Sequence, residues 1–195
     1  MGSWGATDAD EAKPKFLTTE EKKGVYATAS GWVSQAGQAS SGNDNASAQP
    51  EVLVALRGLA TKLGQATVDA VEIVTTAMDA SAGGVLRVDV HYNEQVTVAG
   101  ASPMVVVTNS KAGGGSASNF TLTMDGSLPL TNDTLSFSTT VAGGGAVAAD
   151  DVLSVAAQDV NLNGGTIVDT VGGGNAERAI SGAQGTAAGT ITVVA

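Results

Sequence analysis

The single histidine of the chain, His91, is the first candidate for chemistry, because the sequence contains no cysteine. It lies in the segment VLRVDVHYNEQVTV, where two-residue alternation places it on a polar face with Arg87 and Asp89. A catalytic base needs an orienting partner and a pocket, and a histidine zinc site needs at least one further nitrogen or sulfur ligand. We therefore expect His91 to be an exposed strand residue and the chain not to be an enzyme.

Acidic residues form the next candidate sites. Asp150 and Asp151 are adjacent at the start of an expected strand, and Asp169 and Asn175 bracket an expected turn. Oxygen clusters of this kind can bind Ca²⁺, but the spacing of an EF-hand is not present. The favoured interpretation is solvated turn acids, with Ca²⁺ binding as the alternative, and no cofactor or metal is predicted.

Three triple-glycine runs could be mistaken for phosphate-binding loops. They lie at 113–115, 143–145 and 172–174. A phosphate-binding loop continues with Lys and then Ser or Thr at the start of a helix, and none of the three runs does so. We expect them to be the tips of hairpins.

Charge and hydropathy exclude several classes of partner. Nine basic residues stand against nineteen acidic ones, and the net charge is −10. A nucleic-acid binder needs cations for phosphate groups, and an anionic membrane surface attracts basic segments, so neither partner is expected. The sequence has no apolar run long enough for a membrane span and no apolar N-terminal segment typical of a secretory signal.

Short alternating segments separated by glycine-rich turns dominate from about residue 68 onward. This pattern predicts an antiparallel β-sandwich over 68–195. The inward-facing positions are predicted to form its core, which is expected to contain Leu86, Val88, Val90, Tyr92, Phe120, Leu122, Leu135 and Phe137. The fold class is therefore mainly β, preceded by an extended N-terminal arm with one or two short helices.

The N-terminal third is predicted to consist of three segments. Residues 1–33 form an arm in which Thr18 and Glu21 match a capping box and begin a short helix that extends to about Ala29. A linker rich in Ser, Gly and Asn follows over 34–49. Residues 50–67 form an amphipathic helix with Leu53 and Leu56 on its apolar face.

The arm holds four of the seven aromatic residues of the chain: Trp4, Phe16, Tyr26 and Trp32. Aromatic side chains are favoured as interface hot spots, and a polar, proline-bearing arm is expected to become ordered only on a partner. We therefore predict that residues 1–17 are disordered in the isolated protein. The predicted partner-binding residues are these four aromatics together with Leu53 and Leu56.

Two resemblances extend this interpretation. The stretches VDVHYNEQVTVAGASPMVVVTN, TNDTLSFSTTVAGGG and DDVLSVAAQDVNLNGGTIVDTVGGGNA are similar to bacterial Ig-like domains of surface adhesins, although the triple glycine before Asn175 departs from their pattern. The stretches WGATDADEAKPKFLTTEEKKGVYATASGWV and PEVLVALRGLATKLG resemble the N-terminal region of virion structural proteins of tailed phages of marine cyanobacteria and their relatives. The first resemblance implies an Ig-like sandwich, and the second implies a place on the outer surface of a virion.

The resulting hypothesis is a capsid decoration protein that binds the major capsid protein or another virion scaffold protein through its arm. The Ig-like domain would project outward, the protein would form a homo-oligomer on the particle, and weak contact with a host surface or glycan is expected. One alternative is a structural protein of the tail, neck or fibre. Another is a carbohydrate- or Ca²⁺-binding adhesin.

Overall fold

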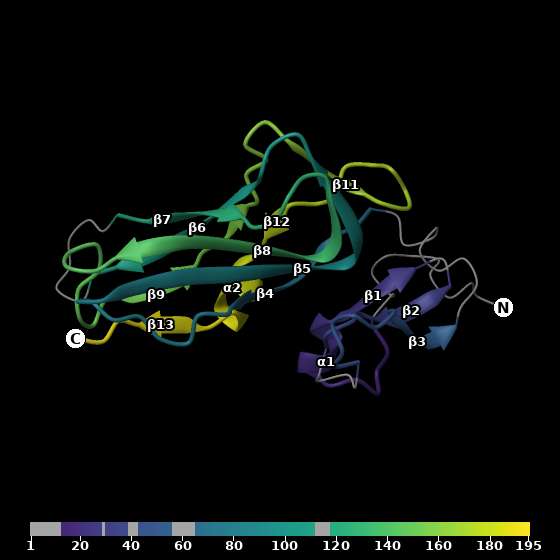
Figure 1. Ribbon diagram of the computed structural model, residues 1–195, viewed down its shortest axis with the longest axis horizontal. Helices are drawn as coiled ribbons and strands as arrows, with labels where there is room; N and C mark the ends of the chain where they lie inside the picture. Colours follow the sequence, from purple (N-terminus) through teal and green to yellow (C-terminus); the bar gives the residue numbers. More distant parts are fainter. Residues whose placement is uncertain (1–12, 29, 39–42, 56–64, 112–117) are drawn as a thin grey trace.

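The protein is mainly β, with thirteen strands and two short helices among the described residues. The structure, a computed structural model, describes residues 13–28, 30–38, 43–55, 65–111 and 118–195. The described part divides into an N-terminal unit within 13–55 and a larger sandwich within 65–195 (Figure 1). No helix in these ranges is long and apolar enough to cross a membrane.

The N-terminal unit begins with α1 (Thr19–Lys23), which starts at the predicted capping box. The Thr18 side chain accepts from the Glu21 backbone N–H, and the Glu21 carboxylate accepts from the Thr18 N–H at 2.6 Å. The predicted extension to Ala29 is wrong, because the helix stops at Gly24 and strand β1 (Val25–Thr28) follows at once. Glycine is a poor interior helix residue, and the following Val and Tyr favour a strand.

Strands β2 (Gly31–Ser34) and β3 (Glu51–Ala55) complete the N-terminal unit. The helix predicted over 50–67 is wrong for residues 51–55, and residues 56–64 lie outside the described part. Pro50 and Glu51 suit a helix start, but Val52 and Val54 are β-branched, and the segment pairs antiparallel with β2. Long-range pairing has therefore overridden the helical pattern.

A separate small core holds the N-terminal unit together. It consists of Leu17, Val25, Ala27 and Trp32, with Leu53 and Val54 packed against it. The Trp32 side chain is fully buried, and burial of a tryptophan contributes a large share of the apolar area of so small a core. Residues 13–28 and 30–34 therefore fold in this structure and do not form the extended arm that the sequence predicted.

The sandwich begins with β4 (Val68–Ile73) and β5 (Gly83–Ala99), followed by β6 (Met104–Ser110), β7 (Phe120–Met124) and β8 (Leu130–Ala142). It continues through β9 (Val152–Val155), β10 (Gln158–Asp159), β11 (Thr166–Asp169), β12 (Ala179–Ile180), α2 (Gly182–Ala187) and β13 (Thr190–Thr192). The main sheet runs β13-β9-β6-β7-β8-β5, and β4 and β11 both pair with the other side of β5. All these pairings are antiparallel.

The sheet folds back on itself around one core. The Val194 N–H donates to the Met78 carbonyl at 2.9 Å, and the Ala80 N–H donates to the Val194 carbonyl at 2.9 Å. These bonds bring the residues that follow β13 against the segment that precedes β5. The architecture is consistent with the predicted β-sandwich.

The predicted core is present with one exception. Seven of the eight predicted core side chains are fully buried, and Phe120 is half-buried. Along β5 and β8 buried positions alternate with more exposed ones, as the two-residue period of a strand requires. The 143–145 glycines form a turn after β8 and the 172–174 glycines lie in a turn after β11, whereas 113–115 fall outside the described residues.

Gly83 shows why the β5–β8 end of the sandwich needs glycine. It has a φ of 71°, and a Cβ at this position would collide with the Val141 carbonyl oxygen of the paired strand. A side chain is therefore excluded both by the left-handed backbone and by the close approach of β8.

The N-terminal unit is attached to the sandwich at the end away from the C-terminus (Figure 1). β1 lies parallel to β5 with Ala27 opposite Glu94, and this register extends the sheet through both units. Lys13 Nζ lies 2.6 Å from Asp69 Oδ2, and the Gln35 side-chain amide donates to Asn132 Oδ1 at 2.9 Å. The two units are therefore joined by polar contacts, while each keeps its own apolar core.

Candidate functional site: a polar cleft between the two units

A cleft of about 420 Å³ lies where the N-terminal unit meets the outward face of the sandwich. We call it the polar cleft. Its N-terminal side is formed by Glu20, Lys23, Gln35 and Gln38. Its sandwich side comes from β4, β5 and β8 and the residue after β4, and includes Glu72, Val74, Arg87, His91, Asn132 and Ser136.

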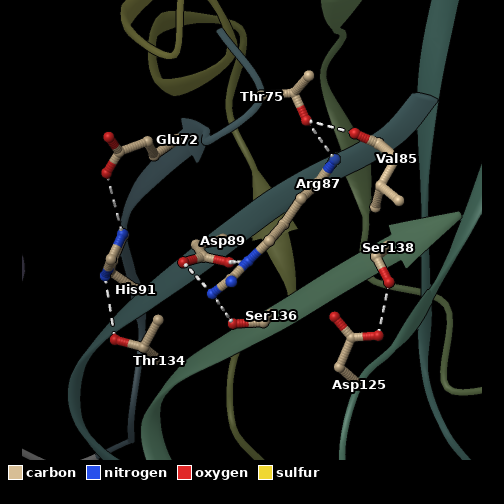
Figure 2. Close-up of polar contacts among 10 residues, drawn as sticks. All are labelled: Glu72, Thr75, Val85, Arg87, Asp89, His91, Asp125, Thr134, Ser136 and Ser138. Atoms are coloured by element: carbon tan, nitrogen blue, oxygen red, sulfur yellow. Dashed lines mark hydrogen bonds and ion pairs between the residues drawn. The ribbon is translucent and has the colours of Figure 1, made fainter. Parts of the chain in front are cut away.

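His91 is buried at the base of the polar cleft, with only 5% of its surface exposed. Figure 2 shows its ring between Thr134 and Glu72: Nδ1 lies 3.1 Å from Thr134 Oγ1, and Nε2 lies 3.7 Å from Glu72 Oε2. The prediction of an exposed residue is therefore wrong. Strand alternation assigned His91 to the polar face correctly, but it could not show that a separate unit packs beside that face.

Burial also sets the charge of His91. Loss of solvent lowers the pKa of the imidazole below its ordinary value, and the positive charges of Lys13 and Lys23 act in the same direction. Asp89 and Glu72 oppose this shift without reversing it. His91 is therefore neutral at pH 7.

Arg87 and Asp89 form a fixed ion pair on the same face of β5. Arg87 Nε lies 3.0 Å from Asp89 Oδ1, and Nη2 lies 3.1 Å from Asp89 Oδ2 and 2.9 Å from Ser136 Oγ (Figure 2). The hydrogen bond to Asp89 raises the pKa of the Arg87 guanidinium above its ordinary value, so Arg87 carries its positive charge at physiological pH. This two-point contact orients the planar guanidinium along the strand.

The backbone of Arg87 is held by the loop after β4. Its N–H donates to Thr75 Oγ1 at 2.8 Å, and the same hydroxyl donates to the Val85 carbonyl at 3.0 Å (Figure 2). After β4 ends, the Thr75 hydroxyl therefore bonds the backbone groups of β5 in place of a paired strand.

Lys23 closes the cleft from the N-terminal side. Its ammonium lies 3.0 Å from Glu20 Oε2 within α1 and 3.0 Å from Glu72 Oε2 on β4. Lys23 is the last residue of α1, and Gly24 caps the helix directly after it. The end of this short helix therefore positions the lysine. The polar cleft therefore depends on the docked position of the N-terminal unit.

Ionisable groups are buried beneath the same junction. Lys13 is 5% exposed, and its ammonium also donates to the Lys22 carbonyl at 2.8 Å. Asp133 is fully buried, and burial raises the pKa of its carboxyl to about 6 against opposing effects of nearby backbone N–H groups and Lys13. Burial, with the nearby Asp133 charge, also raises the pKa of Tyr26.

Glu72, His91 and Thr134 stand in the order of acid, base and hydroxyl, which invites comparison with a nucleophilic triad. The base and hydroxyl are within hydrogen-bond reach, but the 3.7 Å between His91 Nε2 and Glu72 Oε2 exceeds it. Both ring nitrogens are also nearly inaccessible because His91 is buried. The arrangement is better suited to holding the strand faces together than to proton transfer with a substrate.

Two of the acidic candidates from the sequence are structural, and the expectation of solvated acids is wrong for them. Asp151 is buried, and its Oδ2 accepts from Lys111 Nζ at 2.7 Å and from the Ala148 N–H at 2.9 Å. Asp169 is buried, and its Oδ1 accepts two backbone N–H bonds at 2.7 Å from the turn that follows it. Asp150 is exposed, as expected.

Metal binding gains no support from these residues. No group of three or more His, Cys, Asp or Glu side chains within the described ranges could hold a metal ion. Asn175 forms a β-bridge to Val168, so its role near Asp169 is in the turn itself.

Those predicted partner-binding residues that the structure describes do not form one exposed surface. Tyr26 and Trp32 are buried within the protein, and Leu53 is half-buried against the small core. Phe16 remains on the surface with 69% of its area exposed. Trp4 and Leu56 lie outside the described residues. Two of the proposed anchors therefore stabilise this chain's own fold in this structure.

Comparison with protein-family models, with curated proteins and with solved structures found no match for the chain.

Proposed function

We propose that the chain is a non-enzymatic structural protein of a tailed-phage virion, placed on the outer surface of the capsid as a decoration protein. The N-terminal unit attaches to the major capsid protein or another scaffold protein, and the sandwich projects as an Ig-like domain. The resemblance of the N-terminal sequence to phage virion proteins motivates this assignment. One structural observation supports it most: the N-terminal unit has its own core and still exposes large apolar side chains.

Phe16 and Val52 are those side chains, with 69% and 50% of their surfaces exposed. A phenylalanine that becomes fully desolvated in a partner pocket is typical of an interface hot spot. Val52 lies on β3, which is the last strand of the sheet order among the described residues. A terminal strand can accept a strand from a partner through backbone hydrogen bonds. The N-terminal unit thus offers both side-chain and backbone contacts.

Attachment would repeat over many equivalent positions of a capsid, so neighbouring copies would form a homo-oligomer on the particle. A structural protein of the tail, neck or fibre could use the same unit on a different scaffold. Quantitative mass spectrometry of purified particles separates these two locations, because a decoration protein accompanies the major capsid protein in far higher copy number than a tail component does.

Co-sedimentation with particles that lack the protein tests the attachment. We expect Phe16→Ala and Val52→Ala each to weaken binding, with about 2 kcal/mol or more for a hot-spot residue. Val194→Ala is the matched control, because Val194 is 53% exposed but belongs to the C-terminal end of the sandwich. If Val194→Ala weakens sedimentation while Val52→Ala and Phe16→Ala do not, the attachment surface lies on the sandwich and the proposed orientation is wrong.

A further inference from the structure

The polar cleft contains hydrogen-bonding groups whose capacity the protein itself does not use. Within the described chain, Arg87 engages Nε and Nη2 but not Nη1, and Asn132 uses its Oδ1 but not its Nδ2. Ser136 Oγ accepts from Arg87 and retains its hydroxyl hydrogen for another acceptor. Glu72 uses Oε2 for Lys23 and leaves Oε1 available. Unused donors and acceptors therefore line the same cleft.

The charges of the polar cleft are already paired. Lys23 lies between Glu20 and Glu72, and Arg87 is paired with Asp89. Two cations and three carboxylates line the cleft. A negatively charged ligand would meet excess carboxylate, and a positively charged ligand would compete with Lys23 for Glu72. The electrostatics therefore favour a neutral ligand.

Size and surface character restrict the ligand further. About 420 Å³ is within the usual range of small-molecule sites. Val74 lines the cleft with 37% of its surface exposed and provides one apolar contact. A molecule with many hydroxyl groups and an apolar C–H face matches both features, because each hydroxyl donates and accepts one hydrogen bond.

We propose that the polar cleft binds a neutral saccharide. Arg87 Nη1 and Asn132 Nδ2 donate to ring hydroxyls, and Glu72 Oε1 and Ser136 accept from them or donate to them. Gln35 contributes indirectly: its hydrogen bond to Asn132 Oδ1 fixes the amide with Nδ2 as the available donor. Because each net hydrogen bond contributes little, a few such bonds predict a Kd on the order of 1 mM for a monosaccharide.

This inference does not rest on virion attachment, because the cleft residues differ from Phe16 and Val52. NMR titration of the full chain with glucose, galactose, mannose and maltose, each separately, is the direct test. We expect at least one sugar to shift the side-chain signals of Gln35, Asn132 and Arg87 while leaving the backbone signals of β9 and β13 unchanged. A panel in which no sugar shifts the cleft signals in the millimolar range would overturn the proposal.

A pair of substitutions on one strand locates the binding site. Ser136→Val removes a cleft hydroxyl and fills space, whereas Ser138→Val makes the same change two residues along β8, where Ser138 bonds Asp125 outside the cleft (Figure 2). We expect Ser136→Val to weaken sugar binding at least tenfold and Ser138→Val to leave it unchanged. Equal affinities in the two variants would place the sugar elsewhere.

The charge argument has its own control. Glucuronate and N-acetylneuraminate carry a carboxylate on a comparable scaffold, and we expect both to bind more weakly than the best neutral sugar. Tighter binding of either acid to the wild-type chain would contradict the assignment of a neutral ligand.

Discussion

Lys23 Nζ lies 3.0 Å from Glu72 Oε2, and this ion pair joins the end of α1 to the edge strand of the sandwich. The Lys23 side chain is 20% exposed and the Glu72 side chain 38% exposed, so solvent screens the attraction. The same glutamate faces the buried His91. Both residues line the polar cleft, so docking of the N-terminal unit against the sandwich also closes the cleft.

The first prediction measures this ion pair. A double-mutant cycle with Lys23→Ala and Glu72→Ala should give a coupling of about 1 kcal/mol or less, as for other partly exposed pairs. Chemical denaturation of the four proteins gives the value. A coupling of several kcal/mol would mean that the pair is effectively desolvated and that docking is far stronger than its polar contacts indicate.

The second prediction compares two buried residues of adjacent strands. Phe137→Ala should lower the free energy of unfolding by about 3–5 kcal/mol, because the ring is fully buried in the sandwich core. His91→Ala should cost about 1–3 kcal/mol, because it leaves the half-buried Thr134 hydroxyl without the imidazole partner that the structure gives it. Urea denaturation monitors both. A neutral effect of His91→Ala would show that the ring does not contribute to docking.

Strand periodicity explains which parts of this fold were predictable. Leu86, Val88 and Val90 alternate with polar residues, and this local pattern predicted both the strand and its buried face. The β3 strand was not predictable in this way, because Pro50 and Glu51 imitate a helix start and only pairing with β2 selects the strand. The alternation predicted the buried side chains of β5 correctly because one face of this strand packs on the sandwich core.

The polar cleft was hidden from sequence analysis for a related reason. Gln35 and Asn132, which meet across it, are 97 residues apart, and no sequence pattern links the two positions. Burial of His91 depends on the docking of a unit that looked like an extended arm. The one available signal was the aromatic content of residues 16–32, which indicated a need for burial, but Trp32 satisfies that need within its own chain.

The third prediction concerns pH. Burial raises the pKa of Asp133 to about 6, whereas an unfolded aspartate titrates near about 3.9. The folded state therefore binds this proton more tightly, and the stabilising contribution is complete below the unfolded pKa and lost as pH rises through about 6. Asp133→Asn, which resembles the protonated acid, should be more stable than wild type at pH 8, by up to about 3 kcal/mol.

The pKa shift of His91 changes stability with pH in the opposite direction, so the contributions of the two residues must be measured separately. Its lowered pKa gives a contribution that is present above the unfolded value of about 6.5 and lost as pH falls through the folded value. Denaturation of wild type, Asp133→Asn and His91→Ala at pH 5 and pH 8 distinguishes the two. Should Asp133→Asn show the same pH dependence as wild type between these values, the buried carboxyl is not the group responsible.

The fourth prediction tests the independence of the two cores. Trp32→Ala should disrupt the N-terminal unit and cost about 3–5 kcal/mol within it, while the sandwich keeps its structure. Hydrogen exchange should rise in β1 and β2 and remain unchanged in β6 and β9. Loss of protection throughout the chain would show that the two units fold as one.

Lysine cross-linking of intact particles tests the proposed orientation most directly, because most of the lysines that the structure describes belong to the N-terminal unit. Lys15 and Lys22 belong to the N-terminal unit, whereas Lys111 belongs to the sandwich. Mass spectrometry of the cross-linked particles should find the capsid protein joined to Lys15 or Lys22 and not to Lys111. Capsid cross-links confined to Lys111, or cross-links only to tail proteins, would contradict a decoration protein that attaches through its N-terminal unit.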